Sequence, residues 1–286
     1  MVTATSTVDK DEIERFSRIA GEWWNPQGKF KPLHRMNPIR IGWIVEQISK
    51  RDVEMWRCGD VEKKDDRASS SYPHIPTSPH PLKGLRLLDI GCGGGLIAEP
   101  MARLGARVTA IDASEKNIAV ARLHAERGGL EIDYRCAAVE ELSAECTMLS
   151  AEKKNNSLLN AQHSALYDVV LALEIIEHVA DVEAFVAASC ALLKPGGLII
   201  YSTLNRTAKS FALAILGAEY VCGLLPVGTH DWHKFLRPSE LCAHLRHHHI
   251  EILEMTGMAM NPLTFEWRLD AGDLAVNYMV AGRKAI

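Results

Sequence analysis

A glycine-rich turn follows a short, mainly apolar stretch near residue 90. Gly91, Gly93 and Gly95 come at alternate positions after Leu85–Ile90, and a helix-length segment follows them. Glycine lets the backbone turn sharply and approach a ligand, and the next helix presents free N–H groups to that ligand. A dinucleotide-binding loop places a further glycine where this chain has Leu96. The spacing favours a loop for S-adenosylmethionine; the alternative is a plain strand-to-helix turn.

An acidic residue, Asp112, ends the next apolar stretch. Arg107–Ile111 has the composition of a buried strand, and Asp112 comes directly after it. In nucleotide-binding sheets, a carboxylate at this place accepts hydrogen bonds from ribose hydroxyls. Alternatively, Asp112 caps the following helix, as aspartate often does. The spacing from the glycine turn favours the ribose-binding interpretation.

Three ionisable residues, Glu174, Glu177 and His178, follow the fourth predicted strand. If this segment is helical, spacings of three and four residues place their side chains on one face. Two carboxylates and one imidazole suit magnesium, manganese or zinc. They also suit a capped helix with a locally bonded histidine. The spacing alone leaves both interpretations open.

From residue 84 onward, short apolar stretches alternate with helix-length segments. This alternation predicts an α/β fold with a doubly wound, seven-stranded, mostly parallel sheet. The last two strands are joined by turn-rich sequence and should pair as an antiparallel hairpin. The predicted strands are Leu85–Ile90, Arg107–Ile111, Ile132–Cys136, Asp168–Leu173, Leu198–Ser202, Ile250–Met255 and Leu274–Ala281.

Four motifs lie in order on these elements and resemble class I S-adenosylmethionine-dependent methyltransferases over residues 84–204. They are the glycine turn, the strand ending in Asp112, the strand Asp168–Leu173 and the turn Lys194–Gly197. The flanks resemble the ubiquinone biosynthesis O-methyltransferase family in residues 22–40, 202–206, 217–220, 228–231 and 276–278. The chain departs from that family at Asn25, where Asp is usual, and in two polar insertions, residues 51–83 and 145–164.

The resemblance implies an enzyme that methylates a 2-polyprenyl-6-hydroxyphenol and later a 3-demethylubiquinol. In both acceptors the reacting oxygen belongs to a vicinal pair. The resemblance also implies a complex with other ubiquinone-biosynthesis enzymes, and cofactor contacts at Arg40, Gly91, Asp112 and Leu173. Arg40 would pair with the methionine carboxylate of S-adenosylmethionine.

Methyl transfer from a sulfonium is an in-line displacement, so the protein must align the reactants and deprotonate the acceptor. A phenol with a pKa of about 10 needs help at neutral pH. His178 and His230 are candidate general bases. Alternatively, a metal held by Glu174, Glu177 and His178 binds both acceptor oxygens, and the resemblance implies magnesium.

Three other functions compete with this interpretation. They are a nicotinamide-dependent oxidoreductase, a non-catalytic cofactor-binding subunit and a methyltransferase for another phenol or catechol.

Composition limits the partners and the compartment. A formal net charge of -4 predicts no basic field for nucleic acid. The odd number of cysteines, 7, without a C-x-x-C spacing favours a reducing compartment. Residues 1–15 lack an apolar signal core. We therefore expect a cytoplasmic protein, peripheral on the cytoplasmic face of the inner membrane.

The chain is expected to divide into a helical cap (1–50), a flexible insertion (51–83) and a methyltransferase domain (84–286). Pro38 should open the second helix of the cap. Residues 205–240 should form an insertion that faces the substrate and the membrane. Within it, Phe211–Val227 is apolar apart from Glu219 and is flanked by basic residues. This segment is predicted either to enter the membrane interface or to pack on the core as a lid.

Overall fold

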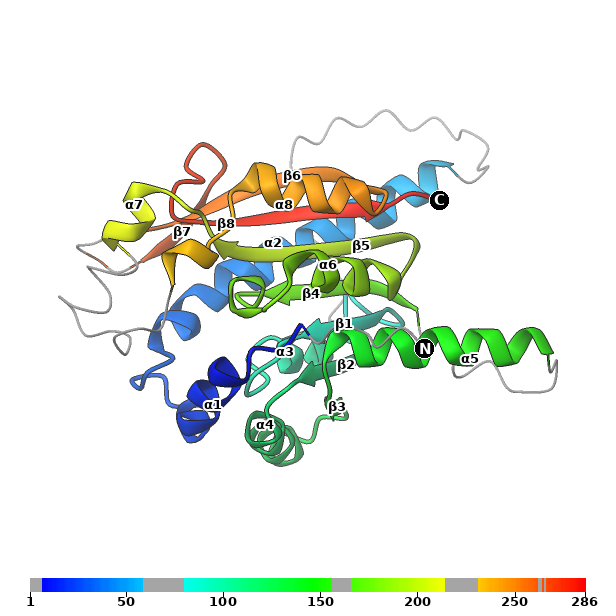
Figure 1. Ribbon diagram of the computed structural model, residues 1–286, viewed down its shortest axis with the longest axis horizontal. Coiled ribbons are helices and arrows are strands. Elements are labelled where there is room, and N and C mark those ends of the chain that lie inside the picture. The colour runs from blue at the N-terminus through cyan, green and yellow to red at the C-terminus, as the bar shows by residue number, and fades with distance from the viewer. Residues whose placement is uncertain (1–6, 59–79, 156–165, 214–230, 262–263, 265) are drawn as a thin grey trace.

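The structure, a computed structural model, describes every residue except 1–6, 59–79, 156–165, 214–230, 262–263 and 265 (Figure 1). The described residues form an 8-stranded sheet with the order β3-β2-β1-β4-β5-β8-β6-β7. The strands are β1 (Arg86–Ile90), β2 (Arg107–Asp112), β3 (Asp133–Cys136), β4 (Tyr167–Leu173), β5 (Leu193–Leu204), β6 (Ile250–Met260), β7 (Trp267–Asp270) and β8 (Asn277–Lys284).

The strands β1 to β5 pair in parallel, so their carboxyl ends meet at one edge of the sheet. The strand order reverses between β1 and β4, and ligands of doubly wound sheets bind outside the carboxyl ends at such a switch point. β8 lies between β5 and β6 and is antiparallel to both. The predicted mostly parallel sheet with an antiparallel final pair is confirmed.

The sheet has one strand more than the sequence predicted. β7 pairs with β6 in antiparallel register, so that Trp267 lies opposite Met260 and Asp270 opposite Gly257. β7 has only 4 residues, and none of them is fully buried. It therefore lacks the apolar run that marks the other strands, and its turn-rich surroundings hide it further.

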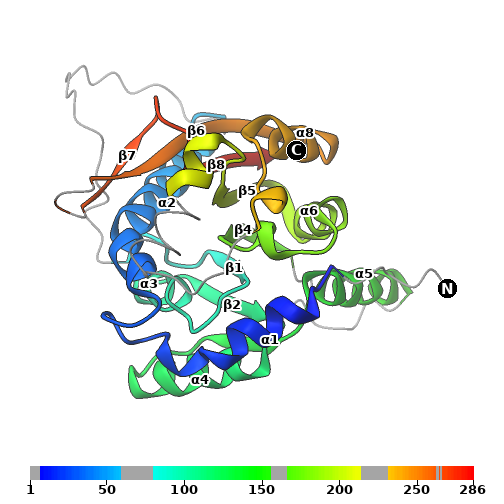
Figure 2. The same ribbon diagram turned by 60° about the vertical axis from the view of Figure 1, so that its left-hand side comes forward.

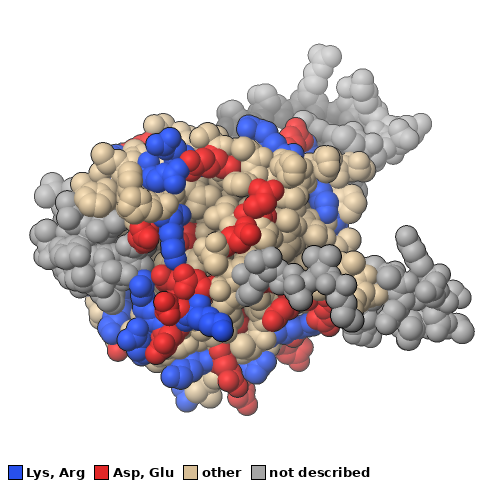
Figure 3. All heavy atoms as spheres, in the orientation of Figure 1, with Lys and Arg blue, Asp and Glu red and all other residues tan. Residues whose placement is uncertain are grey.

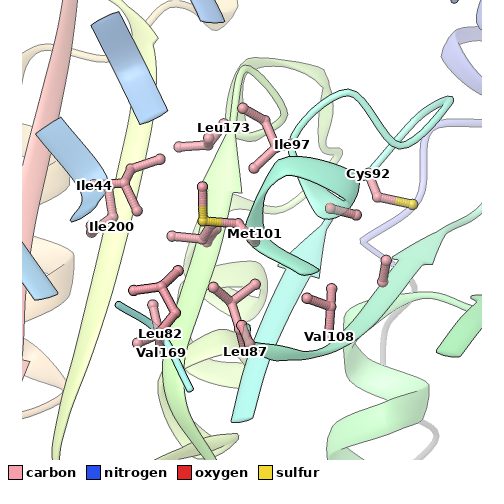
Figure 4. Packing of buried hydrophobic residues seen from close by; sticks show 14 of the residues in the cluster. Ile44, Leu82, Leu87, Cys92, Ile97, Met101, Val108, Val169, Leu173 and Ile200 are labelled. Carbon is pink, nitrogen blue, oxygen red and sulfur yellow. The ribbon is translucent and has the colours of Figure 1, made fainter. Parts of the chain in front are cut away.

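Helices cover both faces of the sheet. Residues alternate along each strand, so that Leu87 and Val169 pack on one face whereas Leu88 and Val170 pack on the other. Figure 4 shows the first of these cores, in which Ile97 and Leu173 lie close together at the carboxyl end of β4. The first face is covered by α2 (Lys31–Cys58), α3 (Ala98–Arg103) and α4 (Glu115–Arg127), and the second by α5 (Val139–Asn155), α6 (Val182–Ala191) and α8 (Pro238–His247).

The N-terminal segment begins with α1 (Lys10–Arg18), followed by a 3-10 helix at Ala20–Glu22. Asp9 caps α1 by accepting hydrogen bonds from two backbone N–H groups of its first turn. Figure 2 shows α1 lying alongside α4, and residues of the two helices are in contact. The segment therefore runs from α2 across the carboxyl ends of the parallel strands.

The helix α2 differs from the prediction at both ends. It begins at Lys31, so Pro38 lies inside it rather than at its start, and it continues to Cys58, past the predicted boundary at residue 50. A proline inside a helix removes one backbone hydrogen bond. The helix persists because it buries Met36, Trp43, Ile44 and Ile48 against the sheet.

Both predicted insertions lie partly outside the described residues. Residues 145–155 of the second one are helical as part of α5, and a one-turn helix, α7 (Ala208–Ser210), follows β5. On the face shown in Figure 3, acidic and basic side chains are interspersed. In the part of the chain that the structure describes, no helix is long and apolar enough to cross a membrane.

Candidate functional site

The glycine turn connects β1 to α3 at the switch point of the sheet. Gly91, Gly93 and Gly95 have φ angles of 71°, 53° and 90°, which favour glycine. A Cβ at Gly91 would lie 2.7 Å from Cγ1 of Ile175. Gly91 N–H donates to the Ile111 carbonyl at 2.8 Å, which ties the turn to β2. The turn is therefore held in one shape by the protein itself.

Asp112 lies at the end of β2, beside this turn. Its Oδ2 accepts from Gly93 N–H at 3.0 Å, and its Oδ1 accepts from Ser114 N–H at 2.8 Å and from Asn117 Nδ2 at 3.2 Å. Burial raises the pKa of Asp112, and the hydrogen bonds from Ser114, Gly93 and Asn117 oppose that shift. The prediction that Asp112 ends the strand is correct. In the folded protein Asp112 lies next to Gly91 and Gly93.

Two neighbouring cavities open at the carboxyl ends of β1 and β4. The smaller, of about 120 Å³, lies against Asp112, and the larger, of about 760 Å³, lies against Arg40, Asp89 and Leu173. Both are lined by Phe16, Trp23, Gly91, Glu174 and His178, so they adjoin. The predicted residues Arg40, Gly91, Asp112 and Leu173 thus lie along one continuous site.

Arg40 projects from α2 into the larger cavity and is only 3% exposed. Its Nη1 lies 3.7 Å from Oε1 of Glu174, and its Nη2 donates to Asn37. Burial raises the pKa of Asp89 to about 7, although the charge of Arg40 opposes the shift. Among the residues that the structure describes, Arg40 Nε and Asp89 Oδ2 have no hydrogen-bond partner, and both atoms are buried. A ligand with both a carboxylate and an ammonium group, such as the methionine part of S-adenosylmethionine, would satisfy both atoms.

Glu174, Glu177 and His178 follow β4 at the junction of the two cavities, where Glu174 and His178 line both cavities and Glu177 lines the larger one. Glu174 has a φ of 52°, an uncommon value for a residue other than glycine. Its Oε1 accepts from Ser202 Oγ at 2.7 Å, and Glu177 Oε2 accepts from Thr203 Oγ1 at 2.7 Å. Ser202 and Thr203 end β5, so the neighbouring strand fixes both carboxylates.

These three side chains share the larger cavity, but each is engaged by another part of the protein. His178 Nδ1 lies 3.2 Å from Glu12 Oε2. Glu177 Oε1 is buried and has no hydrogen-bond partner in the described part of the chain. Among the residues that the structure describes, no group of three or more His, Cys, Asp or Glu side chains is arranged to hold a metal ion. Metal binding by Glu174, Glu177 and His178 therefore stays a prediction, and it requires their side chains to move.

The ionisation of this junction is set by burial and by Glu12. Burial raises the pKa of Glu177, and the nearby Glu174 adds to the shift. For His178, burial acts to lower the pKa, but the hydrogen bond to Glu12 and the surrounding carboxylates outweigh it and raise the pKa overall. Glu12 therefore shifts the equilibrium of His178 toward its protonated form.

Glu12 and the contacts made by α1 were not predicted from the sequence. Thr7 N–H donates to Oε1 of Glu140 at 2.6 Å, and the Lys234 ammonium pairs with Asp9 at 2.8 Å. The Phe16 ring meets His178 edge-on, with ring centroids 5.2 Å apart. These contacts join α1 and the residues just before it to α5, to the 3-10 helix after β4 and to the segment before α8. The second histidine suggested by the sequence, His230, lies outside the described residues.

The far end of the larger cavity is apolar. Met36 of α2, Met258 and Met260 of β6, and Trp267 of β7 line it, at the side of the sheet away from β2. The charged residues Lys209, Arg268 and Asp273 also lie on the lining of this cavity. β7, which the sequence missed, therefore contributes to the wall. The site as a whole combines a polar end, an ionisable junction and an apolar end.

Comparison with known proteins agrees with this arrangement. A methyltransferase domain model matches residues 64–254. A protein of Dinoroseobacter shibae named ubiquinone biosynthesis O-methyltransferase is 48% identical to this chain, and the match covers 98% of this chain and 98% of that protein. A protein of the same name in Brucella anthropi is 45% identical, and the match covers 99% of this chain and 98% of that protein.

A similar protein of the same name in Cereibacter sphaeroides is 47% identical over 98% of both chains. A solved Thermotoga maritima structure, described as a SAM-dependent methyltransferase, possible histamine N-methyltransferase, has a TM-score of 0.54 at 15% identity and covers 95% of this chain and 99% of that one. This last likeness concerns the fold. The relatives and the matching methyltransferase domain show that the chain is an S-adenosylmethionine-dependent O-methyltransferase and belongs to the ubiquinone biosynthesis O-methyltransferase family.

Proposed function

We propose that this enzyme methylates one oxygen of a vicinal pair on a polyprenylated ring, with 2-polyprenyl-6-hydroxyphenol and 3-demethylubiquinol as acceptors. The observation that carries the proposal is the division of the site. A polar end next to Gly91 and Asp112 continues past Glu174 and His178 into an apolar end lined by Met258. The cofactor would occupy the polar end, the ring of the acceptor the junction, and its prenyl tail the apolar end.

At the polar end, four residues would hold S-adenosylmethionine, which supplies the electrophilic methyl group when bound. Arg40 would pair with the methionine carboxylate, and Asp112 would accept from the ribose. Gly91 would allow the backbone to approach, and Leu173 would pack against the ligand at the end of β4. The buried partnerless atoms of Arg40 and Asp89 support this placement.

At the junction, the acceptor hydroxyl would lose its proton to the neutral form of His178. Glu12 lies 3.2 Å from Nδ1 and would keep a proton on that nitrogen, so Nε2 would be the accepting atom. Because Glu12 also raises the pKa of His178, this route would gain strength as the pH rises. A magnesium ion, if bound by Glu174, Glu177 and His178, would lower the pKa of the vicinal oxygens. Buried carboxylates beside the cavity support that route, and the side chains would have to leave Ser202, Thr203 and Glu12.

The apolar end would receive the prenyl tail. Phe211 and Leu213, which begin the predicted membrane segment, are 40% and 54% exposed, and Leu213 lines the larger cavity. Residues 214–227 of that segment lie outside the described residues. We propose that the segment meets the membrane beside the cavity, on the cytoplasmic face, and that the enzyme works in a complex with others of the same pathway.

Liposome flotation tests the membrane proposal. The intact chain should float with anionic vesicles, whereas the Leu216→Glu/Leu224→Glu double variant should stay in the soluble fraction, because charges oppose insertion into lipid. A matching Met148→Glu variant alters an exposed apolar residue on α5 and should float normally. Equal flotation of the intact chain and the double variant would remove this segment from the membrane contact.

The acceptor is tested by assaying purified protein with methyl-labelled S-adenosylmethionine. A short-tailed 3-demethylubiquinol and a tail-less catechol serve as paired acceptors. We expect label in both products, with a much higher kcat/KM for the tailed acceptor because only it occupies the apolar end. Methylation of the catechol alone would point instead to an enzyme for another phenol or catechol.

A further inference from the structure

Trp23, in the segment between α1 and α2, is linked by two hydrogen bonds to the residue assigned to the ribose. Its Nε1 donates to Asn117 Oδ1 at 2.9 Å. Asn117 Nδ2 then donates to Asp112 Oδ1 at 3.2 Å. Trp23 is 8% exposed and Asn117 2%, so water competes little for either bond. Trp23 belongs to the N-terminal segment, whereas Asp112 and Asn117 lie close together in sequence, at the end of β2 and the start of α4.

The order of donors along this path is fixed by chemistry. An indole N–H only donates, so the group of Asn117 that faces Trp23 must be its carbonyl. The Asn117 amide N–H₂ must then face Asp112, where it donates to the carboxylate. With the amide turned around, N–H₂ would face N–H and a carbonyl would face a carboxylate, and both contacts would be repulsive. Trp23 therefore sets the orientation of Asn117.

The carboxylate of Asp112 is oriented in turn. A carboxylate has about four acceptor positions, and Gly93, Ser114 and Asn117 fill three of them. The position left for a ligand therefore has a defined direction. If Asn117 ceased to donate, the carboxylate could rotate away from that direction.

The Trp23 ring is itself held firmly against the cofactor turn. It stacks on Phe30 with centroids 3.7 Å apart and an angle of 6° between the planes. A Cβ on Gly93 or on Gly94 would overlap the ring, so these glycines make room for tryptophan. The indole N–H is consequently presented to Asn117 in one place.

We propose that Trp23 is a positioning residue for the cofactor, which acts through Asn117 to aim Asp112 at the ribose. The proposal rests on the ribose-binding role proposed above for Asp112. It adds to the cofactor site a residue of the N-terminal segment that need not touch the ribose itself.

The test is calorimetric binding of S-adenosylhomocysteine and of its 2′,3′-dideoxy derivative to the full chain. Trp23→Phe keeps an aromatic ring for the stack and removes the indole N–H. It should weaken S-adenosylhomocysteine binding by about 3- to 10-fold, the usual effect of losing one hydrogen bond. Binding of the dideoxy derivative should not change, because it lacks the hydroxyls that Asp112 would accept.

Trp24→Phe is the matched control. Trp24 Nε1 donates to the Gly94 carbonyl at 2.8 Å, on the same turn, but has no bond to Asn117. It should affect both ligands alike. Asn117→Ala should weaken S-adenosylhomocysteine binding by itself, and adding Trp23→Phe to it should cause no further loss.

Each contrary result has a distinct meaning. If Trp23→Phe weakens both ligands equally, or if its effect adds fully to that of Asn117→Ala, Trp23 merely packs and the inference is overturned while the role of Asp112 stands. If Asp112→Ala leaves S-adenosylhomocysteine binding unchanged, the ribose-binding role falls and the inference falls with it. Thermal unfolding of the ligand-free variants separates a binding defect from a folding defect.

Discussion

The cofactor end and the acceptor end of the site are built in different ways. One short stretch of chain, from β1 to the first turn of α4, supplies the glycine turn, Asp112 and Asn117. The acceptor end is assembled from α2, β6 and β7, which are far apart in sequence or at the sheet edge. The first end is shaped by backbone and hydrogen bonds, and the second by apolar side chains.

The difference indicates which changes each end tolerates. At the cofactor end, Gly91 has no space for a Cβ, and Asp112 already accepts three hydrogen bonds. A substitution there disturbs several contacts at once. At the acceptor end, Met260 is 39% exposed and the wall depends on shape and polarity. Substitutions there should change the choice of acceptor before they change the fold.

The largest effect should come from metal removal at the junction between the two ends. Excess chelator should abolish turnover, and magnesium should restore it, because the vicinal oxygens would lose the ion that lowers their pKa. Initial rates with labelled cofactor measure this. Affinity for S-adenosylhomocysteine should stay the same, since Arg40 and Asp112 need no metal. Full activity in excess chelator would leave His178 as the activating group.

The second largest effect should come from Asp112→Ala, which disrupts cofactor binding without changing the acceptor end. The Kd for S-adenosylhomocysteine should rise by about 100-fold, because a charged acceptor at a buried site is lost. Calorimetry measures it. The control is Asp133→Ala on β3, an exposed residue paired with Arg135 and outside both cavities. Similar Kd values for Asp112→Ala and the wild type would contradict the assignment.

A pH effect on stability should follow from Asp89 at the same end. Its pKa is raised to about 7 by burial, from 3.8. Folding therefore favours the protonated form of Asp89, which adds to the free energy of unfolding. This stabilisation is fully present below pH 4 and is lost as the pH rises through 7. Relative to Asp89→Asn, the wild type should lose about 2 kcal/mol between pH 5 and pH 8.

Urea unfolding of the ligand-free proteins at the two pH values measures this difference. Subtracting the variant from the wild type removes the contributions of the other titrating groups. Asp133→Asn should track the wild type at both pH values, because its side chain is 49% exposed. A difference that stays constant with pH would mean that Asp89 titrates normally in the folded protein.

The smallest effect should come from the acceptor end. Met260→Glu places a charge in the apolar wall and should raise the KM for a short-prenyl acceptor by about 10-fold, the equivalent of losing one well-buried apolar contact. The KM for a tail-less catechol and the cofactor Kd should stay within error. Steady-state kinetics with both acceptors decide this, and Met148→Glu is the control. Equal increases for both acceptors would place the tail elsewhere.

The same contrast explains what the sequence could predict. Gly91 and Asp112 were recognised because their signals are local, a turn and a strand end at a fixed spacing. β7 has 4 residues and no alternation to detect, so it was missed. The start of α2 was misplaced at Pro38 because tertiary packing of Trp43 and Ile44 outweighs the local preference of proline.

The contacts of Glu12 and Trp23 could not be predicted for a different reason. Each depends on a partner more than ninety positions away, His178 for Glu12 and Asn117 for Trp23. No local pattern records such a pairing. Of the predicted site, Arg40, Gly91, Asp112 and Leu173 lie along the cavities, whereas their contacts with a ligand stay predictions.

The ring of Trp23 over Gly93 and Gly94 also indicates whether the N-terminal segment and the methyltransferase domain could be separated. By sequence the chain divides into a cap and a domain that starts at residue 84, which suggests two parts that could be separated. In the folded protein, the turn of the second part is completed by an aromatic ring of the first, and α2 buries Ile44 and Ile48 on the sheet. Residues 84–286 alone would expose this face of the sheet and an unfilled turn. Recombining such domains between relatives should therefore succeed only when the N-terminal segment is carried along with its own glycine turn.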